Sequence, residues 1–209
     1  MATGDTPTAT AEPTGGRRAT KPRQHKGLVL VFTGKGKGKS TAAFGLALRA
    51  LGNKLPVLVV QFIKGQWKSG ERTFFEALAL AVEETLGAHV EVYQMGRGFT
   101  IERLRDPRVP MEDHHAAARQ ALAFVQEALL SGRFRMVVLD EILGSIKAGL
   151  VSEDEVLALI AAKPADVHLV LTGRGASEGI VAAADLVTEM REVKHHYKAG
   201  ITAQRGIEF

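Results

Sequence analysis

The sequence lacks cysteine altogether across its 209 residues. This absence excludes a disulfide framework, a thiolate metal site and a cysteine nucleophile, and it is compatible with a reducing cytosol. The sequence also lacks any run of about eighteen apolar residues, so we expect no membrane-spanning helix. Because the Arg17-Arg18 pair is followed by ATKPRQHK rather than by an apolar segment, we expect no twin-arginine export signal. We therefore predict a cytoplasmic protein that contacts no membrane.

The body of the chain also has little net charge of either sign. The formal net charge is +4, of which residues 1–26 contribute +3 and the remainder only +1. A near-neutral body provides no broad footprint for a nucleic-acid backbone, although a local basic cleft is compatible with it. We therefore predict no nucleic-acid partner.

Residues 1–26 lack apolar periodicity. They are dominated by Thr, Ala, Pro, Gly and basic side chains, so they cannot bury enough surface to offset the entropy of ordering. We predict a flexible basic tail. The alternative is a flap that orders over a ligand bound at the active site.

Short apolar runs alternate with longer helical patterns after this tail. Several runs are continuous Val and Leu stretches, which are typical of strands buried on both faces of a parallel sheet. We expect strands at residues 27–33, 56–62, 89–95, 135–140, 167–172 and 186–190.

The helical patterns lie between these runs. Apolar spacing predicts a helix over residues 112–130 that stops near Gly132, and Ser152 with Glu155 forms the capping-box pattern of another helix start. The alternation predicts an α/β fold with a single doubly wound, mostly parallel sheet and helices on both faces, in one domain over residues 27–209. The strand order stays open.

The stretch TGKGKGKST, residues 33–41, follows the first expected strand and precedes the helical pattern AAFGLALRAL. Glycines allow backbone N–H groups to converge on an anion, and a helix N-terminus adds about half a positive charge. Lys39 then supplies a point charge, and Ser40 supplies a hydroxyl ligand for Mg²⁺. The loop is one residue shorter than the pattern GxxxxGK[ST], because Thr33 stands where the first glycine would fall and Gly34 follows it. A lysine-rich surface turn is the alternative, but the flanking strand and helix favour a phosphate-binding loop.

Two other strand ends carry polar groups. VVLDEI places Asp140 and Glu141 at the end of a buried strand, and LTGRG places Arg174 between two glycines at the end of another. In open α/β sheets the ligand lies beyond the carboxyl ends of the strands, so we expect these side chains near the phosphate loop. A carboxylate there can hold Mg²⁺ directly or through water, and a guanidinium can clamp phosphate oxygens. An exposed loop arginine without a ligand is the alternative for Arg174.

These residues by themselves indicate an Mg-ATP site, which kinases, ATP-driven motors and switches share. A narrower resemblance rests on VFTGKGKGKSTAAFG, VVQFIKG followed by GER, GFT at residues 98–100, MVVLDE, LTGRG and the closing VKHHYKAGITAQRGIEF. With these motifs the chain resembles the ATP:corrinoid adenosyltransferases, also called cob(I)yrinic acid a,c-diamide adenosyltransferases, from about residue 27 to the C-terminus. The family loop, GxGKGK[ST]T, has the same shortening. The resemblance implies a P-loop NTPase fold of the RecA-like type.

The resemblance also implies a set of site residues. Lys39 and Glu141 would have the catalytic roles, Ser40 and Glu141 would contact Mg²⁺ or Mn²⁺, and Asp140 would reach the metal through water. ATP would be bound by the loop and one arginine, namely Gly34, Lys35, Gly36, Lys37, Gly38, Lys39, Ser40, Thr41 and Arg174.

The family's reaction joins ATP to a corrinoid substrate. The Co(I) centre of a reduced corrinoid attacks C5′ of the ATP ribose, a cobalt–carbon bond forms and triphosphate leaves, in adenosylcobalamin biosynthesis or salvage. The resemblance implies that ATP lies in the opposite sense to that in ordinary phosphate-loop enzymes, with its γ-phosphate near the usual α position. Because Co(I) is the nucleophile, the protein needs only to position the substrates and stabilise a departing polyanion.

The resemblance implies further contacts and partners. Phe99, within GFTIER, matches a family aromatic that packs under the corrin ring and helps to displace the lower axial ligand, with ordinary core packing as its alternative. Ile101 departs from the family, whose best-known members have tryptophan there. An electron-donating flavoprotein or ferredoxin would reduce the corrinoid, and the enzyme would be a homodimer.

Two other functions stay open from the sequence. A P-loop kinase or a RecA-like ATPase would share the same Mg-ATP site, although a motor would need nucleic-acid stimulation and the near-neutral body weighs against it. A carrier or regulator could bind ATP and corrinoid without turnover, because binding and catalysis would use the same residues.

Overall fold

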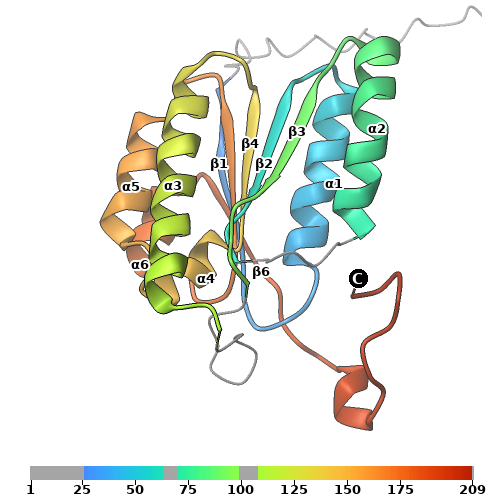
Figure 1. The fold of residues 1–209 in the computed structure, drawn as a ribbon, viewed down its shortest axis with the longest axis vertical. Coiled ribbons are helices and arrows are strands. Elements are labelled where there is room, and N and C mark those ends of the chain that lie inside the picture. Colours follow the sequence, from blue (N-terminus) through green and yellow to red (C-terminus); the bar gives the residue numbers. More distant parts are fainter. Residues whose placement is uncertain (1–25, 64–69, 99–107, 209) are drawn as a thin grey trace, which may run out of the picture.

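The computed structural model describes residues 26–63, 70–98 and 108–208. Its centre is one sheet of six parallel strands in the order β3-β2-β4-β5-β1-β6 (Figure 1). Each strand lies inside a range that the sequence predicts, so the parallel α/β sheet is confirmed. The strands are β1 (Val29–Thr33), β2 (Val57–Gln61), β3 (Val90–Gln94), β4 (Met136–Asp140), β5 (His168–Thr172) and β6 (Leu186–Glu189).

Helices cover both faces of the sheet, which confirms the doubly wound arrangement (Figure 1). One face carries α1 (Lys39–Gly52) and α2 (Gly70–Leu86). The opposite face carries α3 (Met111–Leu130), α4 (Ile142–Lys147), α5 (Glu153–Ala162) and α6 (Glu178–Ala183). A 3₁₀ helix, η1 (His196–Ala199), lies in the segment after β6. Within the described ranges, none of the helices has both the length and the apolar character needed to cross a membrane.

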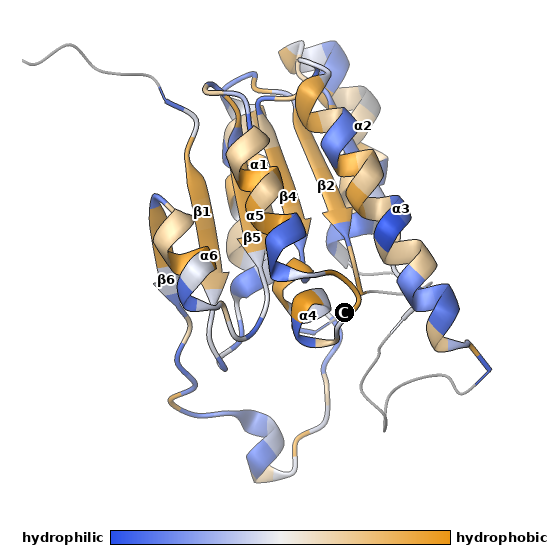
Figure 2. Ribbon diagram, turned by 90° about the vertical axis from the view of Figure 1, so that its left-hand side faces the viewer, coloured by the Kyte–Doolittle hydropathy of each residue, from blue (hydrophilic) through white to orange (hydrophobic). Residues whose placement is uncertain are grey.

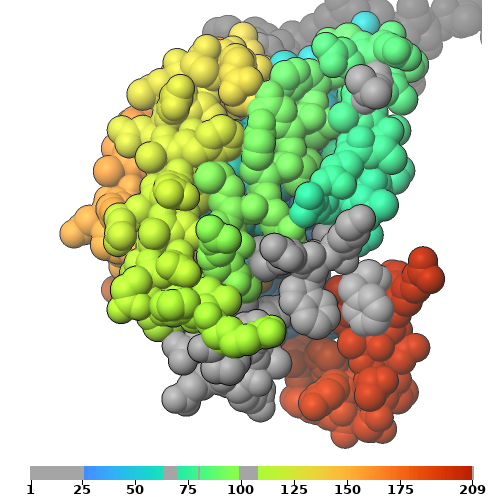
Figure 3. Space-filling model, in the orientation of Figure 1, coloured from blue at the N-terminus to red at the C-terminus, as the bar shows by residue number. Residues whose placement is uncertain are grey.

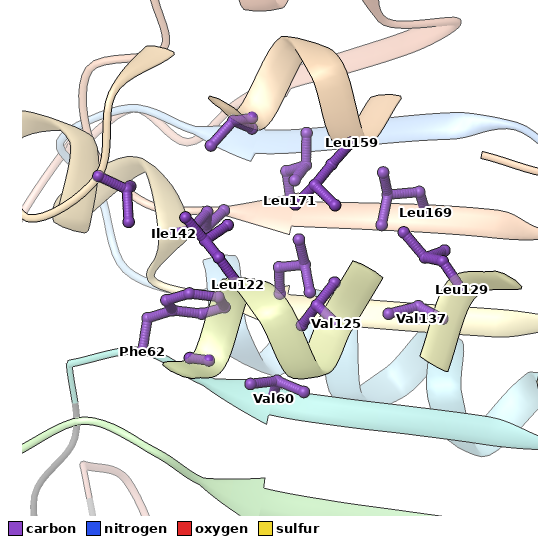
Figure 4. Close-up of a cluster of buried hydrophobic side chains, with 14 of the residues drawn as sticks. Val60, Phe62, Leu122, Val125, Leu129, Val137, Ile142, Leu159, Leu169 and Leu171 are labelled. Atoms are coloured by element: carbon purple, nitrogen blue, oxygen red, sulfur yellow. The ribbon is translucent and has the colours of Figure 1, made fainter. Parts of the chain in front are cut away.

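The strands send alternate side chains into two cores. Leu30 and Phe32 of β1 pack with α1 and α2, whereas Val29 and Val31 pack with the helices of the opposite face. Residues 57–60 are all 0% exposed, which explains why that strand reads as a continuous apolar run. Figure 4 shows the core on the α3 side, and in Figure 2 the apolar strands run through the middle of the ribbon. The sheet therefore packs against helices on both of its faces.

Both predicted helix boundaries are confirmed. The Ser152 hydroxyl accepts the N–H of Glu155 at 3.2 Å, and the Glu155 carboxylate accepts the N–H of Ser152 at 2.7 Å, so the capping box of α5 is complete. The Ser152 N–H and, at 2.8 Å, the Ser152 hydroxyl both donate to the Glu155 carboxylate, and they lower the pKa of Glu155 because they stabilise its charged form. The preceding helix, α3, ends at Leu130, just before Gly132.

The strand order brings three loops to the carboxyl edge of the sheet, at the bottom of Figure 1. The chain leaves β1 toward the face of α1 but leaves β4 and β5 toward the opposite face. Loops that diverge in this way mark the place where open α/β sheets bind ligands. The segment after β6 returns to the same edge, where the Met190 N–H donates to the Thr33 carbonyl at 2.8 Å. It forms the red lobe at the lower right of Figure 3.

Candidate active site

The loop between β1 and α1 has the glycine geometry that its sequence predicts. Gly34 and Gly38 have φ angles of 97° and 104°, in the left-handed region that favours glycine. The segment after β6 supports this loop from behind, since the Gly36 N–H donates to the Met190 carbonyl at 2.7 Å. A Cβ added at Gly36 would lie 2.8 Å from that carbonyl oxygen. The glycines therefore serve packing against residues 190–191 as well as any ligand.

Lys39 is the first residue of α1 and is only 7% exposed. Its Nζ donates to the carbonyls of Gly34 at 3.0 Å and Gly36 at 2.7 Å, so the side chain cross-links its own loop. Burial lowers the pKa of Lys39, the nearby Glu141 opposes that shift, and Arg174 adds to it. The structure thus places three predicted site residues within electrostatic reach of one another.

The other predicted loop residues differ in exposure. Lys35 and Thr41 are exposed, and Ser40 is half-buried beside Lys39. Lys37 is exposed and its Nζ pairs with the Glu208 carboxylate at 2.8 Å. The first turn of α1 contains no acidic residue, and its N-cap, Gly38, has no side chain to cap it. The N–H groups and positive dipole end of α1 therefore face the loop.

Asp140 is completely buried at the end of β4. Its two carboxylate oxygens accept hydrogen bonds from two neighbouring strands, from Thr172 Oγ1 at 2.8 Å and from Gln61 Nε2 at 3.0 Å. Hydrogen bonds to a charged acceptor are stronger than those between neutral groups. The carboxylate is therefore held in one orientation.

Glu141 follows directly and has an unusual backbone. Its φ angle of 63° lies in the left-handed region, where a residue with a side chain is strained. Its N–H donates to Thr172 Oγ1 at 2.9 Å. The loop after β5 packs closely behind it, because a Cβ added at Gly173 would lie only 2.7 Å from the Gly144 nitrogen. Strain held in place by its surroundings is typical of functional sites.

Arg174 is exposed at the turn after β5. Its charge acts on Lys39 and on Glu192, which lies in the segment after β6. The same turn is tied to β1, since the Ala176 N–H donates to Thr33 Oγ1 at 3.2 Å. The guanidinium therefore lies at the same edge as the phosphate loop, as the sequence predicts.

The predicted metal contacts Ser40, Asp140 and Glu141 all lie at this edge, at or after the carboxyl ends of β1 and β4. Among the described residues, no three His, Cys, Asp or Glu side chains gather as a metal-binding group. A cation here would therefore need hydroxyl, water or phosphate oxygens as well, which is the ligand set that Mg²⁺ usually takes. Phe99, the predicted corrinoid contact, lies outside the described residues.

A hollow elsewhere on the surface contains none of these residues. It has a volume of about 500 Å³ and lies between α3 and the connection from α4 to α5. Its lining includes Arg119 and the capping-box pair Ser152 and Glu155. We assign the chemistry to the carboxyl edge of the sheet, because the loop, the carboxylates and the arginine converge there.

Sequence reasoning missed several residues of the site. Gln61 and Thr172 end buried strands with polar side chains, and this was the signal that could have identified them. Met190 and Glu208 carried no local signal, because their roles depend on contacts with the distant phosphate loop.

The fold and the site define an α/β protein of the phosphate-loop class. A glycine loop joins a central strand to a helix that begins with a buried lysine, and a second strand ends in two carboxylates. These are the parts of a phosphate-binding loop and of its acidic partner strand.

Comparison with known proteins identifies the family. The family model described as ATP:corrinoid adenosyltransferase BtuR/CobO/CobP matches residues 25–209. The chain is 46% identical over 190 residues to a corrinoid adenosyltransferase of Pseudomonas aeruginosa, covering 90% of this chain and 86% of that protein. It is 42% identical over 195 residues to a corrinoid adenosyltransferase of a Sinorhizobium species, covering 91% and 84%. The chain therefore belongs to the ATP:corrinoid adenosyltransferase family, and it is a transferase.

Among solved structures, the flagellar accessory protein FlaH of Methanocaldococcus jannaschii aligns with a TM-score of 0.49 and 14% sequence identity, over 78% of this chain and 71% of that chain.

Proposed function

We propose that this protein transfers the 5′-deoxyadenosyl group of ATP to the Co(I) centre of a reduced corrinoid and releases triphosphate, in adenosylcobalamin biosynthesis or salvage. One observation carries the proposal. In a chain of this family, the short glycine loop presents the buried Lys39 beside Asp140 and Glu141 at one edge of the sheet.

The phosphate side of the site follows from this arrangement. The backbone N–H groups of residues 34–41 and the N-terminus of α1 would bind the triphosphate, with Lys39 and Arg174 neutralising its charge. Lys35 and Lys37, both exposed, would contact the same anion from the loop surface. We propose that ATP lies with its γ-phosphate where ordinary phosphate-loop enzymes hold the α-phosphate, so that the ribose faces the second substrate.

The residues at this edge fit Mg²⁺ as a cofactor. Magnesium takes one or two carboxylates together with phosphate and water oxygens. Ser40 and Glu141 would hold the ion directly. Asp140 would act through water, since each of its oxygens accepts one hydrogen bond and keeps a lone pair for a metal-bound water. When bound, the ion would neutralise charge on the triphosphate, and Mn²⁺ accepts the same oxygen ligands.

The transfer step balances without a protein nucleophile. The corrinoid Co(I), which is a substrate, donates an electron pair to C5′, the cobalt–carbon bond forms, and the C5′–oxygen bond breaks. Triphosphate departs with the electron pair of that bond. Lys39, Arg174 and the loop N–H groups stabilise the negative charge that develops on it, which is the form of catalysis that preorganised donors supply.

The corrinoid side of the site is proposed from the family. Phe99 would form an apolar wall under the corrin ring that keeps a coordinating base away from cobalt. In Phe99→Ala we expect corrinoid turnover to be lost while ATP binding stays intact. Unchanged turnover would remove Phe99 from the site.

The division of the chain into a basic tail, residues 1–26, and an adenosyltransferase domain, residues 27–209, belongs to the same proposal.

The partners and the compartment are also proposed. A flavoprotein or a ferredoxin would supply the electron that produces Co(I), since the reaction consumes a reduced corrinoid. Family membership supports a homodimer, which light scattering of the purified protein can test. The absence of cysteine from the sequence supports a cytoplasmic location.

Product analysis tests the function. The purified protein is incubated with ATP, Mg²⁺ and a corrinoid under anaerobic, strongly reducing conditions, with matched reactions that omit the corrinoid or the reductant. We expect free triphosphate and a light-sensitive alkylcobalt product in the complete reaction only. ADP as the nucleotide product would identify a kinase or a RecA-like ATPase, and binding without any product would identify a carrier.

A further inference from the structure

A single hydroxyl connects the two carboxylate residues at the end of β4. Thr172, the last residue of β5, is completely buried. Its Oγ1 accepts the Glu141 N–H at 2.9 Å and lies 2.8 Å from Asp140 Oδ1. An N–H group can only donate, so the hydroxyl uses a lone pair for Glu141 and its proton for Asp140. The hydroxyl therefore donates its only proton to Asp140 and accepts from Glu141, so it bonds both site residues at once.

The second oxygen of Asp140 is fixed from the other side. Gln61 Nε2 donates to Asp140 Oδ2 at 3.0 Å, and both residues are 0% exposed. A flipped amide would set the Gln61 oxygen against the carboxylate, so Asp140 determines the amide orientation. The Gln61 Oε1 is left buried and, among the described residues, without a hydrogen-bond partner. An unpaired buried acceptor disfavours the folded state, so this residue indicates a role beyond stability.

The backbone of Glu141 depends on the same hydroxyl. Its left-handed φ of 63° is strained for a residue with a side chain, and its N–H is directed at Thr172 Oγ1. The turn after β5 packs directly against the start of α4, since a Cβ added at Gly173 would lie 2.7 Å from the Gly144 nitrogen. The hydroxyl therefore holds the orientation of Asp140 and the backbone conformation of Glu141.

We propose that Thr172 is a positioning residue for the metal and triphosphate side of the reaction, with Gln61 as its partner on Asp140. Its hydroxyl holds Asp140 as an acceptor for metal-bound water and holds Glu141 in the conformation that aims its carboxylate at the ion. The inference rests on the proposed function, because it assigns these carboxylates to an Mg²⁺–triphosphate complex. Outer partners of this kind typically change metal affinity or activity by about 10- to 100-fold when they are removed.

Two substitutions of Thr172 separate the hydroxyl from the volume of the side chain. Thr172→Val keeps the shape and loses the hydroxyl, whereas Thr172→Ser keeps the hydroxyl and loses the methyl group. ATP binding is measured by calorimetry across a range of Mg²⁺ concentrations and in EDTA, beside the rate of adenosyl transfer. Thr188→Val, on the edge strand β6, is the matched control.

We expect Thr172→Val to raise the Mg²⁺ concentration for half-maximal ATP binding by about 10- to 100-fold. Its ATP binding in EDTA should be unchanged, and Thr172→Ser and Thr188→Val should behave like the wild type. A wild-type Mg²⁺ dependence in Thr172→Val, or an equal defect in Thr172→Ser, would overturn the proposal.

A further variant tests the proposal in case the first one fails to fold. If Thr172→Val does not fold, Gln61→Met removes the other hydrogen bond to Asp140 and is expected to shift the Mg²⁺ dependence in the same direction. An unshifted dependence in Gln61→Met would then overturn the proposal. If the wild type forms no alkylcobalt product, the proposed function fails, while Mg²⁺-dependent ATP binding by the variants still decides the role of Thr172.

Discussion

The three lysines of the phosphate loop share a sequence pattern but occupy different environments. Lys39 is buried and donates to two loop carbonyls, Lys37 is exposed and paired with Glu208, and Lys35 is exposed. The start of α1 makes the difference, because side chains in a first helical turn lean back toward the N-terminus and so toward the loop. Lys39 is thereby the lysine whose charge reaches Asp140 and Glu141.

Removal of this buried charge should impair adenosyl transfer. In Lys39→Ala we expect the rate of transfer to fall by at least about 10²- to 10³-fold, the loss typical of removing one preorganised donor that stabilises a developing anion. The rate of triphosphate release under reducing conditions is the measurement. Lys54→Gln, after α1 at the opposite edge of the sheet, is the control. A near-normal rate in Lys39→Ala would remove this lysine from the mechanism.

Among the helix N-caps that the structure describes, that of α5 is the most complete. Its Ser152 and Glu155 bond reciprocally, whereas Ser177 of α6 accepts one N–H, from Ile180 at 3.3 Å. We expect Ser152→Ala to lower the free energy of unfolding by about 1 kcal/mol, the usual effect of losing an N-cap. Urea unfolding measures it, and Ser177→Ala should show the smaller loss. Equal losses in the two variants would contradict this ranking.

The segment after β6 is an element of the site as well as an extension of the sheet. Its backbone supports Gly36 through Met190, and its Glu208 carboxylate pairs with Lys37 and lies 3.2 Å from His196 Nε2. The hydrogen bonds from Gln204 and Lys37 lower the pKa of Glu208, so the carboxylate stays charged at neutral pH. The negative Glu208 carboxylate is therefore paired with Lys37, a lysine that we propose contacts the triphosphate.

This carboxylate should compete with the triphosphate for Lys37. In Glu208→Gln we expect ATP to bind about two- to fivefold more tightly, the range that exposed ion pairs span, and we expect salt to reduce the difference. Calorimetric titration with ATP measures it. Asp166→Asn, which breaks the exposed pair with Arg135 at the amino edge of the sheet, is the matched control and should have no effect. Weaker ATP binding by Glu208→Gln would show instead that the carboxylate orients Lys37.

At the scale of the whole molecule, the amino edge of the sheet ties the start of the described chain to its later strands. Lys163 Nζ donates to three backbone carbonyls, including that of Gly27 at 3.0 Å. Asp185 accepts the Val29 N–H at 2.8 Å, and His168 Nδ1 accepts the Leu28 N–H at 3.1 Å. These bonds hold β1, and with it the phosphate loop, in register with β5 and β6.

The histidine in this group makes stability depend on pH. Burial, with a smaller effect of Lys163, lowers the pKa of His168 below its ordinary value. The unfolded chain therefore takes up the proton first, so the contribution of His168 is complete above about pH 6.5 and is lost as the pH falls toward the folded pKa.

Substitution of His168 should flatten this dependence. In His168→Asn an oxygen can still accept the Leu28 N–H but cannot titrate. We expect the unfolding free energy of this variant to fall less between pH 8 and pH 5.5 than that of the wild type, by up to about 1 kcal/mol. This is the net contribution of one hydrogen bond, and solvent screening at the half-buried ring keeps the difference small. Urea unfolding at the two values of pH measures it, and parallel losses in both proteins would contradict it.

The strands and the phosphate loop were predictable from local patterns. Continuous Val and Leu runs identify strands buried on both faces, and the order of strand, glycine loop and helix depends on residues that are neighbours in the chain. The capping box of α5 was predictable for the same reason, because its two partners stand three residues apart. These features use contacts that close within one turn or one strand, so a short stretch of sequence contains the information.

Only the tertiary structure decided the order of the strands and the groups that surround the carboxylates. Thr172 and Asp140 stand 32 positions apart in the sequence, Gln61 and Asp140 stand 79 apart, and Lys37 and Glu208 stand 171 apart. Such contacts depend on which strands become neighbours, and many strand orders are compatible with the same apolar runs. The sequence by itself therefore determined the kinds of element and the phosphate loop. The packing of the whole chain decided which polar ends meet around that loop.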